Sequence, residues 1–211
     1  MARLSAVLFD LDGTLADSLP LSIAGFQHAA EKVAGVTFTD DEVRAGFGPS
    51  EEGMFRKMVP EHWQECLAVY LEYYETQHDE WVQLLPGVAD LLASLHARGA
   101  HVGVVTGKGP EAAAITLDRL GLADTITEVR SGRIGGPEKA TDIRSVLDAW
   151  GVAPADAAYV GDMAGDMRAA QAVGVVPLGA AWDVTADEAE LRAAGAVEVF
   201  CTPGELEGWL R

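Results

Sequence analysis

Short apolar stretches of strand length alternate with longer stretches of helical periodicity along most of this 211-residue chain. Such an alternation predicts an α/β fold, a Rossmann-like and mostly parallel sheet that helices cover on both faces. We expect strands at residues 4–9, 101–105, 126–130, 157–160, 175–178 and 197–200, and helices at 87–98, 110–120, 138–150, 165–173 and 186–194.

The alternation is interrupted after the first strand, because residues 17–85 contain no convincing strand. Ser18 can cap a helix that has Pro20 in its first turn. Residues 62–81 carry apolar and aromatic side chains at helical spacing. We therefore predict an all-helical cap inserted after the first strand, with the cap at residues 16–85 and the α/β core at residues 1–15 and 86–211.

The first apolar strand runs directly into two acids, Asp10 and Asp12. In extended backbone, residues two apart point the same way, so the two carboxylates would crowd each other. At ~4 Å and an effective dielectric constant of about 20, two like charges repel by roughly 4 kcal/mol. A divalent cation removes that cost, and Gly13 and Thr14 allow a sharp turn around it. The pair predicts a site for a metal and a substrate.

Two later strands of the predicted sheet also end in polar residues. Thr106, followed by Gly107 and Lys108, comes after the strand at 101–105, and Asp162 follows the strand at 157–160. Asp166 lies one helical turn farther on, and Lys139 is the only lysine between Thr106 and Asp162 apart from Lys108. Since ligands gather at the carboxyl ends of parallel strands, we expect these side chains to meet at one edge.

Composition narrows the function class. The net charge of −18 argues against nucleic acid or an anionic membrane as a partner. Cys66 and Cys201 match no metal or redox spacing, which favours a reducing cytoplasm. Residues 1–5 have no signal-peptide layout, and no apolar run approaches the ~20 residues of a membrane span. We expect a cytoplasmic protein.

Four of these motifs, taken in order, resemble those of the haloacid dehalogenase-like superfamily. They are Asp10-Leu11-Asp12-Gly13-Thr14, Thr106, Lys139, and Gly161-Asp162 with Asp166 after three further residues. Pro86-Gly87-Val88 and the run from Gly161 to Met167 are also similar to the phosphoglycolate phosphatase-like branch. The resemblance covers the whole chain. Ala140-Thr141 follow Lys139 where the family usually has Pro-x-Pro, and Gly107 replaces a common Asn.

The resemblance implies a reaction through an aspartyl-phosphate. Asp10 would attack phosphorus as the nucleophile. Asp12 would protonate the leaving oxygen and then take a proton from the hydrolytic water. Thr106 and nearby backbone N–H groups would hold the phosphoryl oxygens, whose charge Lys139 would offset.

The same resemblance implies Mg²⁺ as the cofactor, since this ion prefers oxygen ligands. Asp166 would bind the ion directly or orient one of its waters. The other expected metal ligands are the Asp10 carboxylate, the Asp12 backbone carbonyl and the Asp162 carboxylate.

The carboxylate of Asp12 favours hydrolysis of a phosphate ester or anhydride, since the dehalogenases and the phosphonate-cleaving members of the superfamily lack an acid at this position. We expect a small phosphorylated metabolite as substrate, with phosphoglycolate first, inorganic pyrophosphate second and a sugar-phosphate mutase reaction third. The loop from Phe47 to Ser50 resembles a cap loop found in both phosphatase groups, and residues 78–82 lean toward the pyrophosphatases. Arg44, Arg56 and Lys57 are the basic candidates for a second anionic group. The expected substrate-binding residues are Thr106, Gly107, Lys108, Gly48, Ser50 and Arg56.

Two readings from other classes compete with this one. A receiver-type signalling domain also uses acids, a threonine and a lysine around Mg²⁺, but its motif order differs and it lacks a helical insertion. A catalytically silent member kept for protein interaction is disfavoured by the intact acids. The expected assembly is a monomer or a homodimer.

Overall fold

Six parallel strands form the centre of the computed structural model, which describes residues 4–211. Residues 1–3, which belong to the predicted core segment 1–15 and to the stretch 1–5 that lacks a signal-peptide layout, lie outside the described residues. The strand order is β5-β4-β1-β6-β7-β8, which confirms the predicted α/β fold. The strands are β1 (Ala6–Phe9), β4 (His101–Val105), β5 (Glu128–Arg130), β6 (Ala157–Gly161), β7 (Val176–Ala180) and β8 (Glu198–Phe200).

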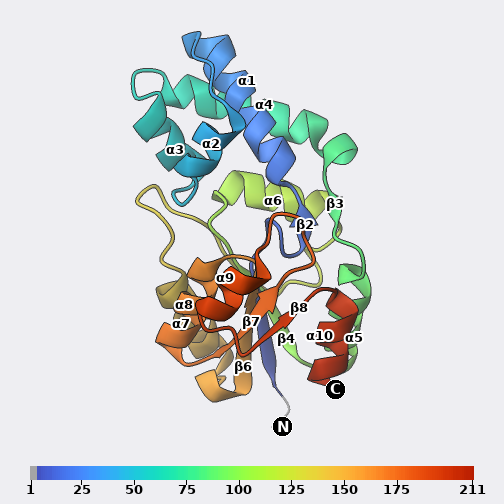
Figure 1. Ribbon diagram of the computed structural model, residues 1–211. Helices are drawn as coiled ribbons and strands as arrows, with labels where there is room; N and C mark the ends of the chain where they lie inside the picture. The colour runs from blue at the N-terminus through green and yellow to red at the C-terminus, as the bar shows by residue number, and fades with distance from the viewer. Residues whose placement is uncertain (1–3) are drawn as a thin grey trace.

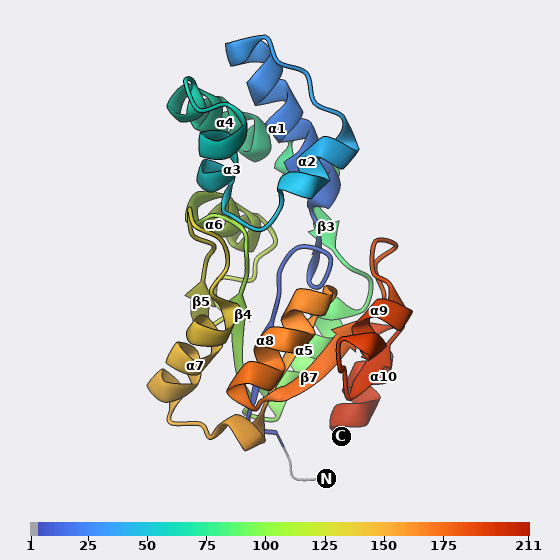
Figure 2. The same cartoon turned by 60° about the vertical axis from the view of Figure 1, so that its left-hand side comes forward.

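Helices cover both faces of this sheet (Figure 2). Alternate residues of β1 point to opposite faces, so Val7 and Phe9 pack with helices α5, α6 and α10, while Leu8 packs with α7 and α8. The helices of the core are α5 (Val88–Ala97), α6 (Pro110–Arg119), α7 (Lys139–Trp150), α8 (Ala164–Val173), α9 (Glu188–Ala193) and α10 (Pro203–Leu210), with a short 3₁₀ turn at Pro154–Asp156. Helix α10 was not among the expected helices, although Thr202 caps it through the backbone N–H of Glu205.

Four helices between β1 and α5 form a block at one end of the molecule (Figure 1). Their bounds are α1 (Leu19–Ala34), α2 (Asp40–Gly46), α3 (Glu51–Met58) and α4 (Trp63–Trp81). Phe26 of α1 stacks on Phe55 of α3 with ring centroids 4.3 Å apart, and Phe55 meets Tyr70 of α4 edge-on. These aromatic contacts give the helical block, called the cap below, an apolar centre.

The expectation of no strand in residues 17–85 is wrong at the edges of that segment. Ala16–Asp17 (β2) and Gln83–Leu84 (β3) form a two-stranded antiparallel pair that carries both connections to the cap. Strands of two residues are too short to show an alternating pattern, so periodicity could not reveal them. The domain boundaries at residues 15/16 and 85/86 stay a prediction.

Ser18 also differs from expectation. It occupies the N-cap position of α1, with Pro20 in the first turn, but its side chain makes no capping hydrogen bond. Its hydroxyl donates instead to the Asp12 carboxylate. Within residues 4–211, no helix has both the length and the apolar composition that crossing a membrane requires.

Candidate active site

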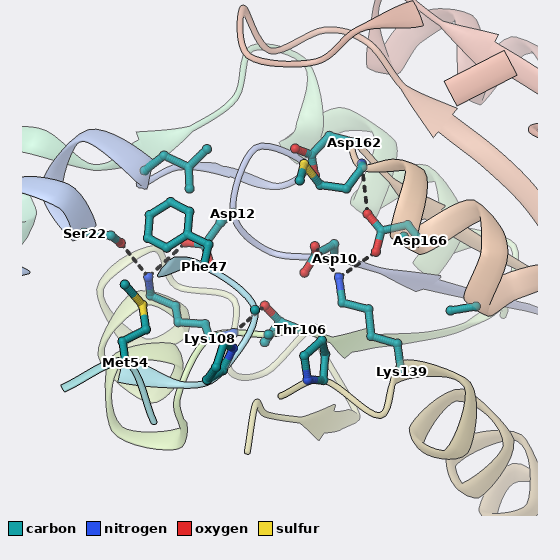
Figure 3. Close-up of a pocket in the computed structure, with 18 of the residues that line it drawn as sticks. Asp10, Asp12, Ser22, Phe47, Met54, Thr106, Lys108, Lys139, Asp162 and Asp166 are labelled. Carbon is teal, nitrogen blue, oxygen red and sulfur yellow. Dashed lines mark hydrogen bonds and ion pairs between the residues drawn. The ribbon is translucent and has the colours of Figure 1, made fainter. Parts of the chain in front are cut away.

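The polar residues expected after the strands meet at the carboxyl edge of the sheet. β1 lies between β4 and β6, so Asp10, Thr106 and Asp162 follow three adjacent strands. The chain leaves β1 toward one side of the sheet and β6 toward the other, and such a switch point is where open α/β sheets bind ligands. A cavity of about 830 Å³ opens there, with walls from both the sheet edge and the cap (Figure 3).

Three acids form a cluster in this cavity. Carboxylate oxygens of Asp10, Asp162 and Asp166 lie within 4.8 Å of one another, and all three residues are buried. Gly13 permits the close approach, because its φ is +74° and a Cβ there would lie 2.6 Å from Asp162 Oδ2. Thr14 Oγ1 donates to Asp162 Oδ1 at 2.9 Å, which fixes that carboxylate.

Burial raises the pKa of Asp10 to about 6, although the Lys139 ammonium opposes the shift. Burial and the neighbouring Asp10 carboxylate raise the pKa of Asp162 well above its ordinary value. The cluster is thus short of positive charge. Its donors are all carboxylate oxygens, the set that hard divalent cations prefer, so the residues fit a bound Mg²⁺.

Lys139, the first residue of α7, lies beside the acid cluster. Its ammonium donates to Asp10 Oδ2 and to Asp166 Oδ1, each at 2.6 Å. Burial by itself would lower the pKa of Lys139, but the two carboxylates more than offset it and hold the pKa well above the ordinary value. Asp166 also accepts a hydrogen bond from the backbone N–H of Met163 at 3.0 Å, so it caps α8 as well.

Asp12 faces away from the acid cluster and toward the cap. Its Oδ1 atom accepts a hydrogen bond from Lys108 Nζ at 2.9 Å and another from Ser18 Oγ. Lys108 was expected to bind substrate. It lines the cavity, but its ammonium is paired with an acid.

Thr106 and Gly107 line the cavity at the end of β4. Thr106 is buried, with 2% of its surface exposed, and its backbone N–H donates to Arg130 O. Its hydroxyl accepts from the backbone N–H of Lys108 at 3.2 Å. The hydroxyl proton is therefore free to point toward a ligand oxygen.

The expected cap residues divide into two groups. Gly48 lines the cavity. Ser50 does not, because its side chain caps α3 and its backbone N–H donates to Arg133 O at 2.9 Å. Arg56 is also directed elsewhere, since it pairs with Glu52 at 2.7 Å and lies over the Trp63 ring.

Among the basic candidates it is Arg44 that lines the cavity, on the cap side. Its side chain is exposed, and among residues 4–211 it has no carboxylate partner. Arg168 of α8, which the motif analysis did not name, lines the cavity as well.

Glu51, at the start of α3, is the clearest residue that sequence reasoning missed. Its Oε2 atom accepts from the backbone N–H of Gly109 at 2.6 Å, so a cap side chain caps helix α6 of the core. Burial raises the pKa of this carboxyl group. No local pattern marks the residue, because its partner lies 58 positions away. Thr14, by contrast, stands inside the first motif and could have been found there.

The chain is similar in sequence and in fold to known hydrolases. A family model described as haloacid dehalogenase-like hydrolase matches residues 7–180. The pyrophosphatase PpaX of Bacillus pumilus is 31% identical over 194 residues, which are 89% of this chain and 88% of that protein. The phosphoglycolate phosphatase of Rhodospirillum rubrum is 31% identical over 231 residues, 97% of this chain and 90% of that protein. The solved structure of a haloacid dehalogenase-like family hydrolase from Streptococcus pneumoniae superposes with a TM-score of 0.80 at 26% identity, over the full length of both chains.

Proposed function

The chain belongs to the haloacid dehalogenase-like hydrolases, as its motifs suggested, and we propose that within this family it is a magnesium-dependent phosphatase of small phosphate monoesters. One observation carries the proposal. Asp10 stands at the end of β1 with one face toward an acid cluster and Lys139, while Asp12 stands beside it toward the cap. In this proposal, the nucleophile and the proton donor face the same cavity.

In the proposed reaction, a carboxylate oxygen of Asp10 attacks phosphorus and the bond from phosphorus to the leaving oxygen breaks. Asp12 gives its proton to that oxygen, and then takes a proton from the water that cleaves the aspartyl-phosphate. Thr106 holds a phosphoryl oxygen through its hydroxyl. Lys139 keeps Asp10 in place and offsets phosphoryl charge.

Mg²⁺ would neutralise charge on the transferred phosphoryl group when bound. Its protein ligands in this proposal are the carboxylates of Asp10, Asp162 and Asp166, together with the Asp12 backbone carbonyl. The crowding of three buried carboxylates supports the assignment, because their mutual repulsion needs a cation in addition to Lys139.

Phosphoglycolate is our first proposed substrate. A relative that is 31% identical is named phosphoglycolate phosphatase. Arg44 offers an unpaired guanidinium to a carboxylate on the leaving group. Inorganic pyrophosphate is the second, on the name of the Bacillus pumilus relative, and Arg44 could meet its second phosphate equally well. A phosphomutase reaction is the third, since it needs the same acid at Asp12. We further propose a cytoplasmic enzyme, monomeric or homodimeric.

A panel of phosphorylated metabolites with Mg²⁺ tests the proposal. We expect phosphate release from phosphoglycolate with kcat/KM at least ~100-fold above that for hexose phosphates, a difference of about 3 kcal/mol in transition-state stabilisation. A comparable preference for pyrophosphate would select the second substrate, and isomerised hexose phosphate without phosphate release would select the mutase. Arg44→Ala should raise KM for phosphoglycolate and leave that for nitrophenyl phosphate unchanged. No turnover on any compound would contradict the function itself.

A further inference from the structure

Lys108 is a buried cation that the proposed reaction does not use. Its side chain is 2% exposed, and its ammonium lies 2.9 Å from Asp12 Oδ1 and 3.0 Å from Ser22 Oγ (Figure 3). The ammonium also lies over the Tyr74 ring, 4.6 Å from the centroid. An ammonium group has three N–H bonds, and these three partners account for all of them.

The hydroxyl of Ser22 has its own proton committed, because it donates to Ser18 O at 3.1 Å. It can therefore only accept from Lys108. With each of its three N–H bonds directed at a partner, Lys108 has none left to offer a substrate phosphate.

The contacts of Lys108 leave the two oxygens of Asp12 unequal. Oδ1 accepts from both Lys108 and Ser18, whereas Oδ2 has no hydrogen-bond donor among residues 4–211. Asp12 lines the cavity, and its side chain is 18% exposed. With one oxygen anchored, a proton on the carboxyl group belongs on the other oxygen, where it can reach a leaving group.

We propose that Lys108 is a positioning residue, which holds Oδ1 of Asp12 so that Oδ2 presents the proton to the leaving oxygen. The inference rests on the proposed phosphatase function. In that step the Asp10–phosphorus bond forms, the bond from phosphorus to the leaving oxygen breaks with its electron pair on that oxygen, and the Oδ2 proton moves there. Ser22 belongs to α1 and Tyr74 to α4, so the anchor is complete only while the cap is docked.

The dependence of rate on the leaving group separates this role from substrate binding and from a structural role. Nitrophenolate leaves without a proton, but an alkoxide needs one. In Lys108→Met we expect kcat/KM to fall roughly 10- to 100-fold for phosphoglycolate, because general acid catalysis contributes a rate factor of that order or more. For nitrophenyl phosphate we expect kcat/KM to fall less than ~3-fold. In an Asp12→Asn background, Lys108→Met should add little, because the two residues act as one unit.

Lys32→Met is the matched control, since Lys32 is an exposed lysine in the last turn of α1, and it should leave both rates unchanged. Ser22→Ala removes one anchor without removing the charge, and should give a smaller loss that is again confined to phosphoglycolate. It serves as the test if Lys108→Met does not fold by circular dichroism. Equal losses of kcat/KM on both esters would contradict the positioning role of Lys108 and leave the proposed function standing. A wild-type protein that hydrolyses neither ester would overturn the proposed function and this role together.

Discussion

Each of the two acids that follow β1 contacts its own lysine. Lys139 donates to Asp10 from the start of α7, and Lys108 donates to Asp12 from the loop after β4. Pairing at these distances fixes both carboxylates in place, because charge-assisted hydrogen bonds in a buried setting are strong and directional. Two acids two residues apart are thereby held in different surroundings, as the proposed roles of nucleophile and proton donor require.

At this scale the first prediction concerns the nucleophile. Asp10→Asn should lower kcat by roughly 10⁴-fold or more, because an amide cannot form the acyl phosphate. Circular dichroism should be unchanged, since the amide oxygen still accepts from Lys139 and a buried negative charge is removed. Asp90→Asn on the exposed face of α5 is the control. Near-normal turnover in Asp10→Asn would contradict the nucleophile assignment.

The second prediction follows from the pKa of Asp10, which burial raises from 3.8 to about 6. Between these values the folded chain holds a proton that the unfolded chain releases. The stability contributed by this group is therefore present below about pH 4 and is lost as pH rises through about 6. A metal ion binds the same Asp10 carboxylate as the proton does, so below about pH 6 the ion must displace the proton in order to bind.

We accordingly expect apparent Mg²⁺ affinity to fall about tenfold for each pH unit below about 6, with at least one proton released per ion bound. Calorimetry at pH ~5 and ~7.5 in buffers of different ionisation enthalpy measures that proton release, and needs no substrate. Affinity that is the same at both pH values would contradict a site centred on Asp10.

At the scale of elements, the cap meets the core at helix α6 and at the loop of residues 131–137. Tyr74 of α4 hydrogen-bonds to Thr116 of α6 at 2.9 Å, and Glu51 accepts from the N–H that precedes this helix. On the loop side, a Cβ at Gly53 of α3 would lie 2.3 Å from Ile134 O. Only glycine allows α3 to approach that backbone so closely.

Gly53→Ala is therefore predicted to push α3 away from the loop and open the wall of the cavity. We expect kcat/KM for phosphoglycolate to fall about tenfold, mainly through KM, because the cap side of the substrate site is displaced. Gly208→Ala in α10 is a matched control, since a Cβ there meets nothing within 4 Å. It should leave kinetics unchanged and stabilise the fold by about 0.5–1 kcal/mol. Wild-type kinetics in Gly53→Ala would contradict a docked cap during catalysis.

The elements differed in how far sequence could predict them. Asp10, Thr106 and Asp162 each follow an apolar strand, and this change from apolar to polar residues is a local signal that sequence shows. Because the strands are parallel, the same signal predicts the sheet edge at which the three residues meet. The pair of β2 and β3 is two residues long on each side, and tertiary contacts alone hold it.

Side-chain contacts were harder to predict than strand ends. Lys108 reaches Asp12 across 96 positions, so no local pattern could indicate that pair. The contact between Arg56 and Glu52 was different, because the two residues stand four apart on one helix and could be predicted as a local ion pair.

At the scale of the whole molecule, a net charge of −18 surrounds a site built for an anion. The two lysines of the cavity are paired with acids, so only Arg44 and Arg168 present uncommitted positive charge among the lining residues. The long-range field therefore opposes the substrate until it is within reach of the site. Salt screens that field beyond about 10 Å at 0.1 M ionic strength but affects buried contacts much less.

The last prediction is that salt increases rather than decreases the efficiency of this enzyme. With Mg²⁺ saturating, raising KCl from about 10 to 200 mM should raise kcat/KM for phosphoglycolate roughly 2- to 5-fold, because screening weakens the global repulsion. Pyrophosphate, which carries more charge, should respond more strongly than nitrophenyl phosphate, and kcat should stay constant because the bound substrate is beyond the reach of the bulk ions. A fall in kcat/KM with salt would instead mean that the local field of Arg44, Arg168 and the metal dominates the approach of the substrate.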